Sequence, residues 1–279
     1  FGGETAIVCA MSGNYVQRGA PAVMDKTLRA KAAVACGADL VVELPTTVSL
    51  SSAEGFAAGG MGILSKLCDA LCFGAETGEA ELLMETARAL LSEDFSPLLR
   101  RELDSGKSFP AARAEALAQM GLSGEILRRP NDILAVEYCK AILELDVPLT
   151  PIPLPRQGAN HGEALNGNVQ FASASALRAL WTQQGVEALR PYVPEAVFPL
   201  YQEAAAAGSS TDFSAAGRCE LALLRARCTG ETPFAKVRGV SEGLEHRLEK
   251  AVRASTTLDE LLNTLTTTRY PRARMRRLA

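Results

Sequence analysis

Three short apolar runs near the start of the chain constrain the fold most strongly. They span residues 5–11, 39–45 and 69–74 and read TAIVCAM, DLVVELP and DALCFG. None of them alternates clearly between apolar and polar residues, which is typical of strands that are buried on both faces of a parallel sheet. Helical patterns at 25–37 and 52–67 separate the runs. This spacing predicts right-handed βαβ units and a doubly wound parallel sheet.

The remaining patterns divide the chain into an α/β part and a helical part. Residues 79–120 predict a helical insertion, and 128–145 predict a further helix. A proline-interrupted strand is predicted at 149–156, at an edge or an end of the sheet. After about residue 190 the chain shows helical patterns only. We therefore expect an α/β domain at 1–190 and an all-helical domain at 191–279.

Composition narrows the class of protein. The hydrophobic content of 47% and the charged content of 22% are typical of a globular protein in water. No apolar run approaches the ~20 residues that a membrane-spanning helix needs, and FGGETAIV is not a secretory signal. The seven cysteines are scattered, and Cys68 and Cys72 have neither CxxC spacing nor a nearby His. We expect a cytoplasmic protein without a metal site or a membrane partner.

Charge is distributed unevenly along the chain. Residues 1–210 carry 16 Lys and Arg against 24 Asp and Glu, whereas residues 211–279 carry 13 against 8. A nucleic-acid partner is therefore to be sought on the C-terminal part, although an ordinary basic helical domain explains the excess equally well. The same two interpretations apply to the arginines of RYPRARMRR, which either bind phosphates or start a solvated helix. These arginines are Arg269, Arg272, Arg274, Arg276 and Arg277.

Small and polar residues follow the predicted strands. MSGNYVQRG follows the first strand, FGAETGE the third, and PRQGANHG the proline-interrupted one. Ligands bind outside the carboxyl ends of the strands in open parallel sheets, so these loops predict a binding site at one edge of the sheet. No Walker loop, GxGxxG motif or Ser/His/Asp set is present to define its chemistry.

Several positions in these loops have a structural and a functional interpretation. Gly74 is either a turn glycine or a place where a ligand approaches the backbone closely. Asn131 precedes a helix, so it is either an N-cap or a reader of a nucleobase edge. Arg156, followed by Gln157, is either a surface arginine or a phosphate ligand.

Ser173 and Ser175 lie at the start of a predicted helix, in SASALR. Hydroxyl groups and free N–H groups at a helix N-terminus can hold a phosphate. Each serine, taken singly, is also explained as an ordinary helix cap.

The chain resembles the bacterial tRNA(Met) cytidine acetate ligases. The resemblance rests on the block from MSGNYVQRG to VVELP and on SSAEGFAAGGMGILSKL, LCFGAE, RRPNDILAVEY, FASASALR, VSEGLEHRL and TRYPRARMRR, in this order. These blocks extend over essentially the whole chain. The family implies a Rossmann-like domain of the nucleotidyltransferase type, followed by a helical tRNA-binding part.

The resemblance also implies an activity. Members of this family activate acetate with ATP to acetyl-adenylate and then acetylate the wobble cytidine of elongator tRNA(Met), without acetyl-CoA. The mixed anhydride makes a poor electrophile reactive, and the enzyme supplies positioning and charge stabilisation at the α-phosphate. The expected substrates are therefore ATP, acetate and tRNA(Met), and ATP is expected to bind with Mg²⁺.

Site residues follow from the resemblance by position. It implies nucleotide contacts for Gly74, Asn131, Arg156 and Gln157. Ser173 and Ser175 correspond to a serine-rich phosphate-binding segment, which FASAS matches loosely. The catalytic residues are not identified; Gln17 and Arg18 are candidates because they line the expected crevice.

The chain departs from the family at its ends. The family begins with a strand and an NPFHNGH-like motif whose histidines embrace the ATP phosphates, and no such motif occurs here. We expect a core fragment in which sequence upstream of Phe1 and downstream of the last helix is missing. Two other functions stay open: a nucleotidyltransferase acting on a small metabolite, and a non-catalytic tRNA-binding protein.

Overall fold

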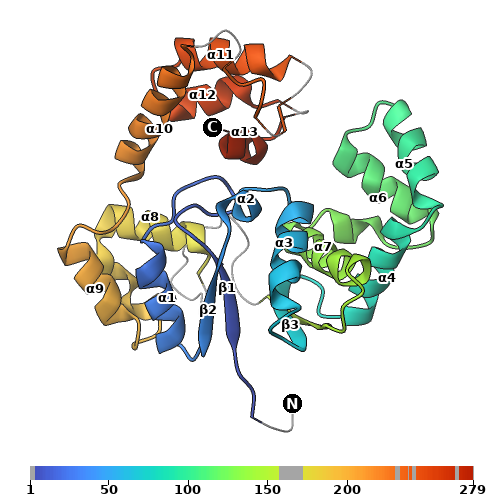
Figure 1. Cartoon of the computed structure of the whole chain (residues 1–279), viewed down its shortest axis with the longest axis horizontal. Helices are drawn as coiled ribbons and strands as arrows, with labels where there is room; N and C mark the ends of the chain where they lie inside the picture. The colour runs from blue at the N-terminus through green and yellow to red at the C-terminus, as the bar shows by residue number, and fades with distance from the viewer. Residues whose placement is uncertain are drawn as a thin grey trace.

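The computed structural model of the 279-residue chain shows a parallel α/β arrangement with a helical bundle at one end (Figure 1). It describes residues 4–156, 172–229, 233–237, 239–240, 243–267 and 270–278. None of the helices in these ranges is long and apolar enough to cross a lipid bilayer.

The strands lie where the apolar runs predict them. They are β1 (Val8–Ser12), β2 (Leu40–Leu44), β3 (Ala70–Ala75) and β4 (Thr150–Pro155). β1 pairs in parallel with β2, and β3 pairs in parallel with β4. The parallel α/β class expected from the sequence is therefore confirmed.

The strands form two separate two-stranded sheets, where the sequence predicted one doubly wound sheet. β1 and β3 both line a cavity of ≈ 930 Å³. Met61 and Leu64 of helix α3 (Ala53–Leu64) and Tyr138 of helix α7 (Pro130–Glu144) also line it. Hydrophobic periodicity shows that a strand is buried but not which strand lies beside it, so the division was not visible in the sequence.

Local signals fix the ends of the first helix, α1 (Lys26–Ala35). The Asp25 side chain accepts hydrogen bonds from the backbone N–H groups of Thr27 and Leu28, as an N-cap does. Gly37 has φ +101°, the left-handed conformation expected of a glycine that follows a helix. Both features were predicted from the sequence.

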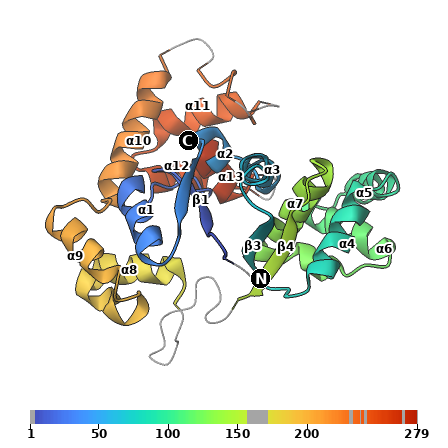
Figure 2. The ribbon, with the colours of Figure 1, turned by 60° about the horizontal axis from the view of Figure 1, so that its bottom comes forward.

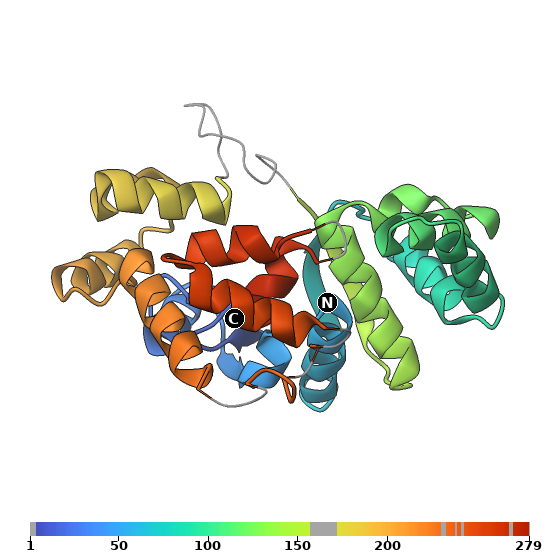
Figure 3. The same ribbon diagram turned by 90° about the horizontal axis from the view of Figure 1, so that it is seen from above.

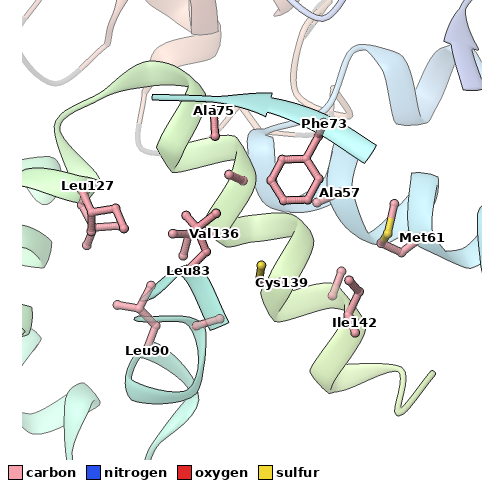
Figure 4. Packing of buried hydrophobic residues seen from close by; sticks show 14 of the residues in the cluster. Ala57, Met61, Phe73, Ala75, Leu83, Leu90, Leu127, Val136, Cys139 and Ile142 are labelled. Carbon is pink, nitrogen blue, oxygen red and sulfur yellow. The ribbon is translucent and has the colours of Figure 1, made fainter. Parts of the chain in front are cut away.

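The largest hydrophobic core surrounds the β3–β4 sheet and its helices (Figure 4). Phe73 of β3, Met61, Leu83, Val136 and Cys139 pack together in this core. The predicted insertion at 79–120 consists of three helices joined by turns, without a strand. The helices between β2 and β4 are α2 (Thr46–Ser49), α3 (Ala53–Leu64), α4 (Ala80–Leu91), α5 (Phe95–Asp104), α6 (Phe109–Gln119), the 3-10 helix η1 (Gly124–Leu127) and α7 (Pro130–Glu144).

A second core belongs to the C-terminal bundle, in which Phe234, Leu248, Leu261, Leu265 and Met275 are buried against one another. Helices next to α1 lead into this bundle (Figure 2). The elements after β4 are α8 (Ala174–Gln184), the 3-10 helix η2 (Val186–Tyr192), α9 (Phe198–Ala206), α10 (Phe213–Arg227), α11 (Leu244–Ala254), α12 (Leu258–Leu265) and α13 (Arg272–Leu278). α11 begins later than the predicted residue 239, because Gly243 has φ +81°.

The bundle rests on the loop that follows β1, above the carboxyl end of that strand (Figures 1 and 3). The Thr211 N–H donates to the Val23 carbonyl at 2.8 Å, and the Thr211 hydroxyl donates to the Ala22 carbonyl at 2.6 Å. Gly19 has φ +78°, and a Cβ added there would lie 2.6 Å from the carbonyl group of Arg276 in α13. A glycine at this position therefore lets the loop and the helix touch.

Candidate functional site

The pairing of β3 with β4 brings Gly74 and Arg156 together. Gly74 lies opposite Leu154, and the backbone N–H of Arg156 donates to the Ala75 carbonyl at 2.9 Å. A Cβ added to Gly74 would meet only the Arg156 side chain, at 3.9 Å. The exposed Arg156 guanidinium thus emerges beside a stretch of accessible backbone.

Asn131 lies next to the end of the same strand, in the first turn of α7. Its side-chain Nδ2 donates to Oε1 of Glu76 at 2.6 Å. The N-cap interpretation of Asn131 is wrong, because α7 begins at Pro130 and Arg129 occupies the N-cap position. Proline is favoured at the first helical position and therefore moves the cap one residue earlier.

Glu76 supplies the capping oxygen that Asn131 was expected to provide. Its Oε2 accepts from the backbone N–H of Asp132 at 2.8 Å, so this carboxylate satisfies a free N–H at the start of α7. Burial acts to raise the pKa of Glu76, but the hydrogen bonds from Asn131 and Asp132 outweigh it and hold the pKa below its usual value. Glu76 is therefore ionised at neutral pH and accepts hydrogen bonds only.

Asp132 fastens the start of α7 to the loop after β3. Its side chain is fully buried and accepts from the N–H and the hydroxyl of Thr77, at 2.8 Å and 2.9 Å. Nε of Arg129 lies 2.7 Å from the same carboxylate. Sequence reasoning missed both Glu76 and Asp132. Two signals in the sequence were available. Glu76 comes directly after a predicted strand, in FGAETGE, and Asp132 follows the proline that opens the helix.

The residues predicted after β1 lie near the C-terminal bundle. Arg18 lines a cleft of ≈ 910 Å³ together with Arg218, Arg272 and Arg276. Gln17 is half-buried in the same loop. The structure therefore groups Arg18 with the C-terminal arginines.

Ser173 is the N-cap of α8, as its structural interpretation predicted. Its hydroxyl accepts from the Ala176 N–H at 3.2 Å and lies 3.1 Å from the Ser175 hydroxyl. Arg178, one turn further on, was not singled out in the sequence. Burial and the nearby charge of Arg18 both lower the pKa of Arg178. An anion between the two guanidinium groups would relieve this repulsion.

The C-terminal arginines are largely engaged inside the bundle. Arg276 pairs with Glu220 at 2.6 Å, and Arg272 pairs with Asp259 at 2.5 Å. The Arg274 guanidinium donates to the Gly239 carbonyl at 3.0 Å and lies over the Tyr270 ring.

Burial lowers the pKa of Arg277, and the nearby charge of Arg274 lowers it further. Arg269 and Gln157 lie outside the described residues. In the described part of the chain, no group of three or more His, Cys, Asp or Glu side chains suits a metal ion.

Comparisons with known proteins identify the family of the chain. A model of the HIGH nucleotidyl transferase family matches residues 2–279. The tRNA(Met) cytidine acetate ligase of Geobacillus sp. (strain WCH70) is 32% identical over 282 residues, covering 99% of this chain and 70% of that protein. The tRNA(Met) cytidine acetate ligase of Clostridium botulinum (strain Okra / Type B1) is 34% identical over 286 residues, covering 98% and 69%.

Two solved structures of Thermotoga maritima TmcAL have the same fold. The apo structure superposes with a TM-score of 0.89 at 32% identity, covering 98% of this chain and 67% of that one. The structure bound with alpha-thio ATP gives 0.86 at 31% identity, covering 98% and 66%. From these matches, the chain belongs to the tRNA(Met) cytidine acetate ligase family of HIGH nucleotidyl transferases.

Proposed function

We propose that this chain is part of an ATP-dependent ligase that acetylates the wobble cytidine of elongator tRNA(Met) to N4-acetylcytidine. Family membership supports the reaction, and the TmcAL structure bound with alpha-thio ATP supports ATP as the nucleotide. The observation that carries the assignment in this chain is the convergence of Gly74, Asn131 and Arg156 where β3 and β4 end.

The proposed reaction has two steps. An acetate oxygen attacks the α-phosphorus of ATP, which enters with Mg²⁺, and pyrophosphate leaves. The exocyclic amine of cytidine then attacks the acetyl carbonyl of acetyl-adenylate, losing a proton as AMP leaves. The electrophile is already activated, so acetyl-CoA is not needed.

The residues of the β3–β4 site have distinct proposed roles. The guanidinium of Arg156 offers several fixed N–H donors, which suit phosphate oxygens. Gly74 leaves its backbone accessible to the nucleotide. Asn131 carries a polar amide that is held by Glu76, two residues after Gly74 in the chain. Gln157, Ser173 and Ser175 complete the proposed nucleotide contacts.

We propose that the tRNA lies along the cleft between the loop after β1 and the C-terminal bundle. Arg18 and Arg272 line this cleft, and Arg274 and Arg277 lie on the same helix as Arg272. Arg269 and Arg276 belong to the same basic set. Gln17 and Arg18 lie where the bundle meets the α/β part and stay our candidates for residues at the reacting groups.

The test is the reaction itself, with the natural full-length protein. Incubation with ATP, acetate and tRNA(Met) should yield N4-acetylcytidine, detected by mass spectrometry of the digested tRNA. Omission of ATP or acetate should abolish the product, and acetyl-CoA should not replace them. The proposal fails if no tRNA is acetylated. Pyrophosphate exchange with another acid would instead indicate a nucleotidyltransferase that acts on a small metabolite. Binding of tRNA without binding of ATP would indicate a non-catalytic tRNA-binding protein.

A further inference from the structure

The orientation of the Asn131 amide is set by its neighbour Glu76. One carboxylate oxygen accepts from Asn131 Nδ2 at 2.6 Å, and the other accepts from the backbone N–H of Asp132 at 2.8 Å. The backbone N–H cannot be replaced by an acceptor, and an ionised carboxylate has no proton to donate. Asn131 must therefore turn its NH₂ group toward Glu76 and its Oδ1 away.

The hydrogen bonds to Glu76 remove the usual ambiguity between the two ends of the Asn131 amide. The oxygen and nitrogen of an asparagine have nearly the same shape, so the hydrogen-bond partners decide which is which. Asn131 is half-buried, and within the described part of the chain no group donates a hydrogen bond to its Oδ1. The amide thus offers a fixed acceptor next to Glu76, in the loop that follows β3.

The charges around Asn131 favour a ligand group that carries donor hydrogens. Glu76 forms no ion pair among the residues that the structure describes, and its negative charge lies directly behind the amide. Asp132 is paired with Arg129. An oxygen of a phosphate placed directly against Oδ1 would face this negative charge without a donor between them, whereas an amino group placed there would be attracted. The phosphates are therefore expected on the Arg156 side of the site.

Resting on the proposed function, we propose that Glu76 is a positioning residue that selects the base of the nucleotide through Asn131. Oδ1 of Asn131 accepts a hydrogen bond from the 6-amino group of adenine. A purine with a 6-oxo group would place its oxygen against Oδ1, leaving two acceptors without a donor. The site therefore accepts ATP and rejects ITP.

Replacing Glu76 with glutamine should reverse this selection. The Asp132 N–H still needs an acceptor, so the carbonyl oxygen of the introduced glutamine faces it and the new NH₂ group faces Asn131. Asn131 then turns its oxygen toward that NH₂ group and presents its own NH₂ to the base. The amide becomes a donor, which pairs with a 6-oxo purine.

The experiment compares ATP with ITP in acetate-dependent pyrophosphate exchange by the natural full-length protein. Wild type should prefer ATP. In Glu76→Gln, the ratio of kcat/KM for ITP to that for ATP should rise by about 10-fold or more, the scale of one unpaired buried polar group. Glu125→Gln is the matched control, because Glu125 is exposed and forms its ion pair with the neighbouring Arg128. Its ratio should equal that of wild type.

A second variant guards against loss of the helix cap in Glu76→Gln. Asn131→Ala retains Glu76 as the cap of Asp132 and removes the acceptor from the base, so its preference between ATP and ITP should disappear. Equal losses for ATP and ITP in both variants would overturn the inference and leave Glu76 as a cap only. A changed discrimination against 2′-deoxy-ATP, with the ITP ratio unchanged, would also overturn it. Failure of wild type to use either nucleotide would instead overturn the proposed function.

Discussion

At the scale of single residues, Asp132 holds the start of α7 against the end of β3. Its fully buried carboxylate joins Thr77 and Arg129. Asp132→Ala should lower the free energy of unfolding by about 3–5 kcal/mol, because it leaves buried donors and a cation without their partner. Urea unfolding measures this, with the exposed Asp104→Ala as control. Equal unfolding midpoints for the two variants would contradict the role of Asp132.

Arg156 should affect ATP binding and not stability. Its side chain is exposed, so Arg156→Ala should leave the thermal unfolding temperature nearly unchanged. ATP affinity should fall by about 10-fold or more, since a charged hydrogen bond to phosphate is lost. Calorimetric titration measures the affinity, with the exposed Arg100→Ala as control. A large drop in thermal stability with unchanged ATP affinity would show that Arg156 is structural.

Residue-scale prediction from the sequence was limited by long-range contacts. Gly74 and Arg156 lie near the ends of paired strands. The carboxyl ends of parallel strands share one edge of a sheet, so the positions of these residues in their predicted strands suffice to predict that they lie close together. Glu76 and Asn131 are 55 positions apart in the chain and are joined by a side-chain hydrogen bond. Such a bond produces no periodic pattern in the sequence from which it could be predicted. The serine cap of α8 was predictable because a cap is local, whereas the approach of Arg18 to Arg178 was not.

At the scale of elements, the strands and most helices follow from local patterns. β1, β2 and β3 lie within a few residues of the predicted apolar runs, and Asp25 caps α1 as expected. The arrangement of strands into two sheets did not follow, because pairing depends on which edges meet in space. The late start of α11 reflects the left-handed Gly243, which helical periodicity alone does not show.

The contact between the loop after β1 and α13 gives an element-scale prediction. Gly19→Ala should lower the free energy of unfolding by about 2 kcal/mol or more, because it adds both a strained φ and a clash with the Arg276 backbone. Gly208→Ala is the control: Gly208 also has positive φ, at +63°, but no atom lies near its added Cβ. Chemical denaturation compares the two. Equal losses would contradict a tight contact at Gly19.

At the scale of the whole molecule, the basic bundle and the α/β part meet at one cleft. The charge excess of residues 211–279 was compatible with a nucleic-acid face and with an ordinary basic helical domain, and it did not show that Arg276 is held by Glu220. Salt bridges between residues far apart in the sequence are not readable from composition. Replacing Arg276 would disturb the bundle, so Arg274 and Arg277 are the better probes of RNA binding.

The double variant Arg274→Ala/Arg277→Ala should weaken tRNA binding and flatten its dependence on salt. Each lost phosphate contact should reduce the slope of log K against log salt concentration by about 0.7–0.9. Filter binding from low to moderate salt measures both quantities. The exposed pair Lys66→Ala/Arg100→Ala removes the same charge elsewhere and serves as control. An unchanged slope in the first variant would place the RNA on another face.

The most direct test of the whole account is a crystal structure of the natural full-length protein with a non-hydrolysable ATP analogue. We predict that the nucleotide lies where β3 and β4 end, with its adenine amino group within hydrogen-bond distance of Asn131 Oδ1. The Arg156 guanidinium should contact a phosphate in the same structure. A nucleotide bound elsewhere, out of contact with Gly74, Asn131 and Arg156, would contradict it.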